Sequence, residues 1–308
     1  MGHFARKGGF ICMDIVSQKY KSKFLLVIFL CAWGGFSMPA AAAVLDRARS
    51  AGVMPHKALY DVRLSAKKSD SNISNISGTM FYEWQPSCDA WVSTHRFDMT
   101  YEYPEVPPVR ITSDFSTYES FDGGTFNFTM QRKRGGILYE EIRGGAKVGE
   151  GKDYPVDAVY SIPKDLSFHL PEGTLFPMAH TLSVLEKIKQ GKRFYNATIF
   201  DGSDEQGPVD VNSFIGKAAA YSPPEEYAQY IDKDLIAAQG WNMRLAFFPL
   251  NNFEEIADYE MSLVVHENGV ITDMEVNYKD FSVTQTLRAL EPLESTCGTE
   301  ENDSTKEH

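Results

Sequence analysis

Five histidines inside the chain are the side chains whose type best suits acid–base or metal chemistry. Histidine changes its charge near neutral pH and is the commonest protein ligand for metals. A paired zinc motif needs two histidines on one helical face, and no such spacing occurs in this sequence. We therefore predict that each is a packed or solvent-exposed side chain. The five are His56, His95, His169, His180 and His266.

The acidic run Asp201–Glu205 is the segment that most resembles a calcium site. A helix–loop–helix calcium loop requires glycine at the position of Gln206 and glutamate at the position of Asn212. Because both positions differ, we predict no calcium site here. The run is expected to form an acidic turn between strands around Ile199 and Val211.

Other catalytic signatures are absent from the sequence. It contains no Gly-x-Ser-x-Gly elbow, no P-loop and no dinucleotide fingerprint. The pairs Glu140-Glu141 and Glu225-Glu226 are adjacent, so on a strand their side chains point to opposite faces. We predict no catalytic, cofactor-binding or metal-binding residue and no enzymatic activity. A hydrolase of envelope polymers remains an alternative, if the fold brings carboxylates or a histidine pair together.

The first 43 residues have the pattern of a cleaved secretion signal. Lys19, Lys21 and Lys23 form a basic region, residues 24–30 are apolar, and small residues follow at 39–43. The apolar run is shorter than the roughly 20 residues of a spanning helix. We predict export to a bacterial periplasm and a mature protein that does not span the membrane. Either Met1 or Met13 is the start.

Removal of residues 1–43 takes away five basic side chains and one acidic side chain. The net charge then changes from −12 to −16. Nucleic acids and anionic membrane faces select clusters of Lys and Arg, so this balance argues against both as partners.

Two of the four cysteines, Cys88 and Cys297, lie beyond the predicted signal. Two cysteines in an exported protein most simply form one disulfide. A bridge that closes so long a loop would contribute roughly 5 kcal/mol in the loop-entropy description, and real bridges often contribute less. Two unpaired buried thiols are the alternative.

The rest of the sequence favours β-strands. Apolar and polar side chains alternate along many short runs, the signature of strands with one buried face. Asp122-Gly123-Gly124 and Glu267-Asn268-Gly269 are typical hairpin turns. We expect strands near residues 58–65, 80–84, 91–101, 126–130, 245–248, 259–265, 270–277 and 281–290. Such a series predicts a meander that curls into an open barrel or spiral.

Helix is expected in two places. Residues 177–190 place apolar side chains at helical spacing, with Pro177 at a favourable first position and Gly191 at the stop. Ser222-Pro223-Pro224-Glu225 has the spacing of a capping box and predicts a second, short helix. Residues 298–308 are polar and are expected to be disordered.

Aromatic residues make up 13% of the chain, a fraction high enough that some of them could lie outside the hydrophobic core. Packing within the sheet accounts for most. A curved sheet with a helix across its mouth also favours a concave apolar groove, which would suit an acyl chain, a peptide or a lipoprotein segment.

Several short runs, in order along the chain, resemble the EipB family of cell envelope integrity proteins. The resemblance extends over residues 55–297, and Lys279 departs from it where the family has glycine. The runs are Tyr60–Val62, Cys88, Leu170–Pro177 with His180, Phe200–Asp204, Asn268–Val270, Tyr278–Phe281, and Leu290–Leu293 leading to Cys297.

The resemblance implies a periplasmic β-spiral of residues 44–297, with one main helix packed against the sheet and one disulfide, Cys88–Cys297. It also implies a role in envelope integrity under stress without an established catalytic activity. We expect a hydrophobic ligand, a lipid, a lipoprotein or an envelope protein as the binding partner, and no cofactor. A scaffold with a filled core that acts through its outer surface is the alternative.

Overall fold

The computed structural model describes residues 52–69, 71–147, 156–250 and 256–294. The predicted signal (1–43) and the predicted disordered tail (298–308) lie outside these residues, so both remain predictions. Among the described residues, no helix is long and apolar enough to cross a bilayer.

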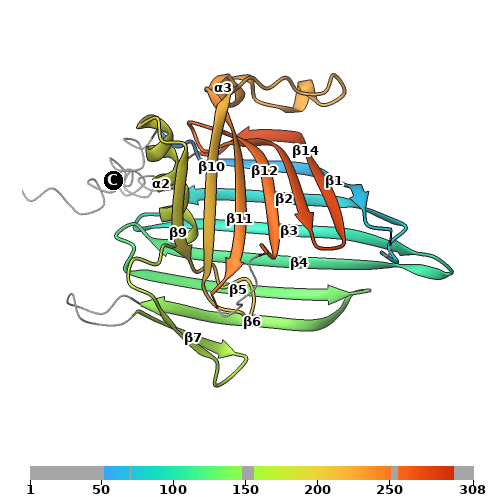
Figure 1. The fold of residues 1–308 in the computed structure, drawn as a ribbon, viewed down its shortest axis with the longest axis horizontal. Coiled ribbons are helices and arrows are strands. Elements are labelled where there is room, and N and C mark those ends of the chain that lie inside the picture. Colours follow the sequence, from blue (N-terminus) through green and yellow to red (C-terminus); the bar gives the residue numbers. More distant parts are fainter. Residues whose placement is uncertain (1–51, 70, 148–155, 251–255, 295–308) are drawn as a thin grey trace, which may run out of the picture. The chain divides into compact units, whose positions relative to one another are not determined.

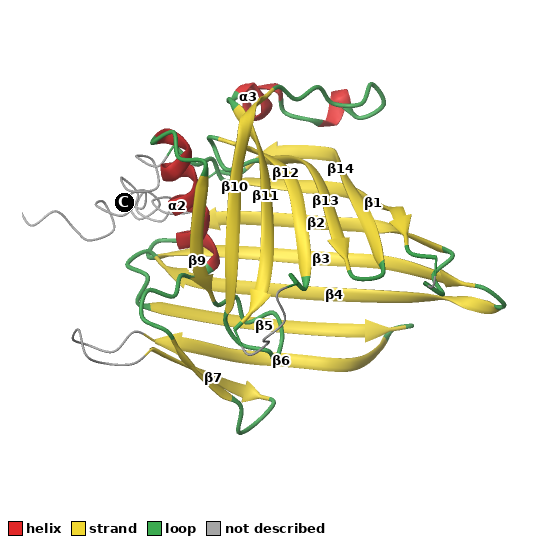
Figure 2. Cartoon of the chain, in the orientation of Figure 1, coloured by secondary structure: helices red, strands yellow, loops and turns green. Residues whose placement is uncertain are grey.

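The described chain is dominated by one 14-stranded antiparallel sheet (Figure 2). Its strands are β1 (His56–Lys67), β2 (Asn75–Pro86), β3 (Ala90–Tyr103), β4 (Val106–Ser120), β5 (Thr125–Arg134), β6 (Ile137–Lys147), β7 (Val156–Ile162), β8 (Ser167–Leu170), β9 (Phe194–Ile199), β10 (Val209–Ala219), β11 (Gly240–Pro249), β12 (Tyr259–His266), β13 (Ile271–Tyr278) and β14 (Phe281–Pro292).

Strands that are consecutive in sequence pair from β1 to β8 and again from β9 to β14, and β1 pairs with β14 to join the two runs. This pairing brings His56 opposite Pro292 and Lys67 opposite Phe281. The two end strands of the sheet are β8 and β9, which do not pair with each other among the described residues. The prediction of a long antiparallel sheet that curls without closing is confirmed.

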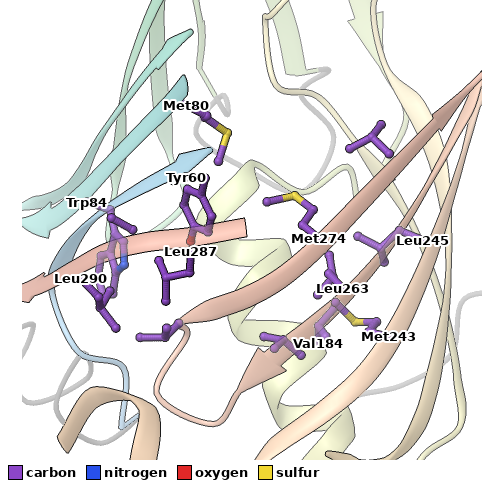
Figure 3. Close-up of a cluster of buried hydrophobic side chains, with 14 of the residues drawn as sticks. Tyr60, Met80, Trp84, Val184, Met243, Leu245, Leu263, Met274, Leu287 and Leu290 are labelled. Atoms are coloured by element: carbon purple, nitrogen blue, oxygen red, sulfur yellow. The ribbon is translucent and has the colours of Figure 1, made fainter. Parts of the chain in front are cut away.

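The curl follows from the alternation of side chains along each strand. In β1, every second residue from His56 to Val62 is buried, which gives the sheet one continuous apolar face. Strands β10–β12 cross in front of β2–β4 (Figure 1), and the apolar faces of β10–β12 and of β2 and β3 belong to one buried cluster. Met80 and Tyr60 on one side face Met274 and Leu263 on the other (Figure 3).

A second buried cluster lies under β5–β8. Its centre is aromatic: Phe126 stacks on Phe176 at 4.7 Å between ring centroids, and Phe128 lies edge-on to Phe200 at 5.6 Å. The loop after β9 closes over this cluster, because the Tyr160 hydroxyl donates a hydrogen bond to the Asp204 carbonyl at 2.7 Å.

Helix α2 (Pro177–Lys189) confirms the predicted main helix. The second predicted helix is wrong in position: Ser222–Glu225 has no helix, and a 3₁₀ turn, η1 (Ala228–Tyr230), and α3 (Lys233–Ala237) follow it. The Asp232 carboxylate accepts hydrogen bonds from the Asp234 and Leu235 amides, so the effective cap lies ten residues after Ser222.

Candidate functional site

Helix α2 connects the two ends of the sheet, since it follows β8 and precedes β9. Leu175 forms a parallel bridge with Ile199 just before the helix begins. Val184 of α2 points into the buried cluster (Figure 3), and His180 stacks on Tyr195 of β9 at 6.0 Å between ring centroids. The helix therefore packs its apolar face against the curled sheet.

The start of α2 is capped by a side chain from β4. The N-cap residue of the helix, Phe176, has an apolar side chain that cannot accept a hydrogen bond from the first helical amides. Both carboxylate oxygens of Glu119 fill this role, because Oε2 accepts from the Met178 amide and Oε1 from the Ala179 amide, each at 2.8 Å. Glu119 is only 3% exposed, and this burial raises its pKa to about 7 although the two amides favour the charged form.

A groove of about 600 Å³ lies beside this contact. Its volume falls in the range of small-molecule sites, roughly 300–1,000 Å³. Trp91 and Phe121, edge to face at 4.9 Å, form part of an apolar wall. The lining comes from β3, from the end of β4 and the turn after it, from Leu175 and from α2: Trp91, Glu119, Ser120, Phe121, Asp122, Gly123, Leu175, Ala179, Leu182, Ser183, Leu185, Glu186 and Lys189.

Polar side chains are also buried in this part of the inner face. Ser93 and Thr117 form a hydroxyl pair at 2.6 Å across β3 and β4. The Tyr82 ring lies 4.6 Å from that of His95, and burial, together with the negative charge of Glu119, raises the pKa of the Tyr82 hydroxyl. These four side chains lie outside the groove lining, whereas the buried Glu119 is part of it, so the groove itself combines an apolar wall with one enclosed carboxyl group.

The five histidines take separate structural positions. Burial lowers the pKa of His56, His95 and His180 to about 4, which keeps all three neutral at neutral pH. His266 is buried, with Nδ1 2.7 Å from the Ala238 carbonyl, and the exposed His169 lies 3.1 Å from Asp157. The Tyr82 ring lies between His95 and His56, at 5.9 Å from the latter.

The acidic run 201–205 forms the predicted turn between β9 and β10. Asp201 and Asp204 accept hydrogen bonds from the Ser203 and Gln206 amides, an ordinary use of aspartate in turns. Burial raises the pKa of Asp204, and the charges of Asp201 and Glu140 add to this effect. In the described part of the chain, no group of three or more potential metal ligands converges.

Two further hollows lie on the opposite, outer face of β9–β14. One, of about 590 Å³, includes Ser262, Glu275 and Thr284; the other, of about 520 Å³, includes Phe194 and Phe214. Both are more open than the α2 groove, which makes the latter the better candidate site.

Cys88 lies in the turn between β2 and β3, whereas Cys297 lies outside the described residues. The Cys88–Cys297 pairing therefore stays a prediction. Cys88→Ser is expected to lower the free energy of unfolding by about 2–3 kcal/mol, because the unfolded chain regains the freedom of a long loop. Urea unfolding of wild type with and without reductant measures this effect. Equal stability of the two forms would contradict it, while a Ser87→Ala variant controls for changes to the turn itself.

Sequence reasoning identified the helix and its expected groove but missed Glu119. The available signal was its inward position on β4, two residues after Thr117 and two before Phe121. A carboxylate at such a position requires a partner, and the helix amides provide one.

Comparison with known proteins agrees with this architecture. The chain is 29% identical over 262 residues to the cell envelope integrity protein EipB of Brucella abortus (strain 2308), an alignment that covers 84% of this chain and 89% of that protein. A crystal structure of a β-barrel-like protein of unknown function from Brucella abortus matches with a TM-score of 0.72 and 28% identity. That match covers 79% of this chain and 99% of the other. The EipB-like family matches residues 47–294, so the chain belongs to the EipB-like family.

Proposed function

We propose that this protein supports the integrity of the cell envelope from the periplasm, and that it does so by binding rather than by catalysis. The name of its Brucella relative supports the envelope role, and the predicted secretion signal supports the location. The groove between α2 and the β3–β4 end of the sheet is the observation that carries the binding proposal.

The groove suits a ligand with an apolar chain and a polar end. Trp91, Phe121 and Leu182 offer apolar surface, which an acyl chain or an apolar protein segment would cover. Glu186 and Lys189 offer charges of both signs for a polar group. We favour a single acyl chain, as found on lysophospholipids and lipoproteins, because the volume matches one chain better than a folded partner.

Lysophosphatidylethanolamine with a saturated acyl chain is expected to raise the melting temperature of the wild-type protein. A ligand at one hundred times its Kd stabilises the folded state by about 2.7 kcal/mol. Ser183→Phe places a ring in the groove and is expected to abolish the rise. Lys187→Phe is the matched control, since Lys187 lies on the same helix against Tyr195 and does not line the groove.

Two outcomes would contradict the binding proposal. One is a wild-type melting temperature that the lipid leaves unchanged. The other is an equal rise in wild type and Ser183→Phe, which would place the lipid elsewhere on the protein.

A scaffold with a filled core is the second candidate function. The centre of the curl is occupied by packed side chains from β1, β2, β11–β14 and α2, including Tyr60, Leu287 and Met243 (Figure 3). This packing favours action through the outer surface. A scaffold would lose function on mutation of outer-face residues and would tolerate Ser183→Phe.

A further inference from the structure

The hairpin formed by β5 and β6 ends in three consecutive exposed apolar side chains. Ile137 is 75% exposed, Leu138 45% and Tyr139 49%. Exposed runs of this kind favour aggregation and are normally avoided on a protein surface unless they serve a function. The turn before them, Gly135-Gly136, has φ values of 56° and 85°, which glycine adopts without strain.

Basic side chains lie directly opposite this apolar run. Arg134 pairs with Ile137, Lys133 with Leu138, and the Arg134 guanidinium lies 5.4 Å from the centre of the Tyr139 ring. Arg132 is neutralised by Glu140 at 2.8 Å. Among the described residues, Lys133 and Arg134 have no acidic partner, so the hairpin end carries a local positive charge on an acidic chain.

The end of the β5–β6 hairpin does not pair with the neighbouring strand β7. Strand β7 pairs with β6 from Arg143 to Lys147, so among the described residues no strand pairs with the stretch from Ile137 to Ile142 on that side. On the other side, the Gly135 amide donates to the Arg110 carbonyl of β4 at 2.9 Å, so the end is held in place by the sheet.

The net negative charge of the chain disfavours anionic membranes, but Lys133 and Arg134 make this end locally basic. From these contacts we infer that the β5–β6 end docks on a bilayer surface rich in anionic phospholipid. Successive residues of a strand point to opposite faces, so Ile137 and Leu138 extend in different directions. A flat surface of a partner protein would cover only one of these two side chains. Insertion of the hairpin end into the membrane interface would bury both. Lys133 and Arg134 then lie at the level of the phosphates.

This surface is separate from the α2 groove, and neither proposal requires the other. Its test uses protein recovered after export and flotation with two kinds of vesicle. One kind contains phosphatidylethanolamine and phosphatidylglycerol, and the other contains phosphatidylcholine alone. Wild type is expected to float with the first kind and to bind the second weakly, because each cation near an anionic surface strengthens binding about fivefold.

Three variants locate the surface. Ile137→Asn is expected to reduce partitioning about tenfold, through loss of one buried apolar side chain. The double change Lys133→Gln and Arg134→Gln is expected to reduce partitioning about 25-fold and to remove the preference for phosphatidylglycerol. Phe194→Asn is the matched control, because Phe194 is also 75% exposed but lies on β9, and it should float like wild type.

Three results would overturn the inference. They are absence of wild-type binding to both kinds of vesicle, equal binding by wild type and Ile137→Asn, and a loss confined to Phe194→Asn. Binding of soluble polyglutamate tests the alternative that an acidic protein segment occupies this surface. If it binds wild type but not the double variant while vesicles bind neither, an acidic protein segment and not a membrane occupies this surface.

Discussion

Gly202→Ala is expected to lower the free energy of unfolding by about 2–5 kcal/mol. Gly202 adopts a φ of +67°, where a side chain costs about 1–2 kcal/mol. A Cβ added there would also clash with the ring of Phe128 in the second buried cluster. Overpacking of a core costs a further 1–3 kcal/mol or so. Urea unfolding, followed by far-UV circular dichroism, measures the sum.

Gly173→Ala is the control that separates the two causes. Gly173 has a similar φ of +81°, but a Cβ there would meet no heavy atom within 4 Å. This variant should lose only the backbone contribution, about 1–2 kcal/mol. Equal losses for the two glycines would contradict a close contact between the loop at Gly202 and Phe128.

Glu119→Ala is expected to cost about 3 kcal/mol of stability and to loosen α2. The change leaves the buried Met178 amide and the partly buried Ala179 amide without their acceptor, and a buried group of this kind costs about 1–3 kcal/mol. Hydrogen exchange at these two amides should accelerate more than exchange in β12. Glu186→Ala is the matched control, because Glu186 lies on the same helix but is exposed, and its side chain accepts a hydrogen bond from Gln190 and not from the first amides of the helix. A loss of stability as large in Glu186→Ala would contradict the capping role.

The same carboxyl gives a pH dependence with a definite sign. Its pKa is about 7 in the folded protein and 4.5 as its ordinary value, so the folded state binds the proton more tightly than the unfolded state. Its contribution to stability is therefore fully present below pH 4.5 and is lost as the pH rises toward 7. Relative to Glu119→Gln, wild type should lose about 2–3 kcal/mol over this interval. A constant difference between the two proteins across the interval would contradict the raised pKa.

The strands and the main helix were predictable because their signals are local. Alternation from Ala58 to Leu64 predicts β1, and the turn at Asn268-Gly269 predicts the hairpin of β12 and β13. Pro177 and Gly191 mark the limits of α2 to within one residue of those observed. Each of these features depends on residues close together in the chain.

Features that depend on distant residues were not predictable in the same way. Glu119 accepts hydrogen bonds from α2 amides that lie about 60 residues later in the chain. No local pattern in the sequence indicates that these two segments are in contact. The short helix was misplaced because Ser222-Pro223-Pro224-Glu225 matches a capping box, although the segment is held instead by tertiary contacts. Tyr227 donates to Asp61 at 2.6 Å, and Ile231 forms a bridge with Leu290. Such contacts override local propensity.

The central proposal is that the α2 groove holds an apolar ligand in the envelope. Native mass spectrometry of the protein extracted from its own periplasm tests it most directly, because a retained ligand appears as added mass. We predict that wild type and Lys187→Phe carry the mass of an acyl-chain compound and that Ser183→Phe does not. Wild type at the mass of the polypeptide alone, or Ser183→Phe with the same added mass, would contradict the proposal.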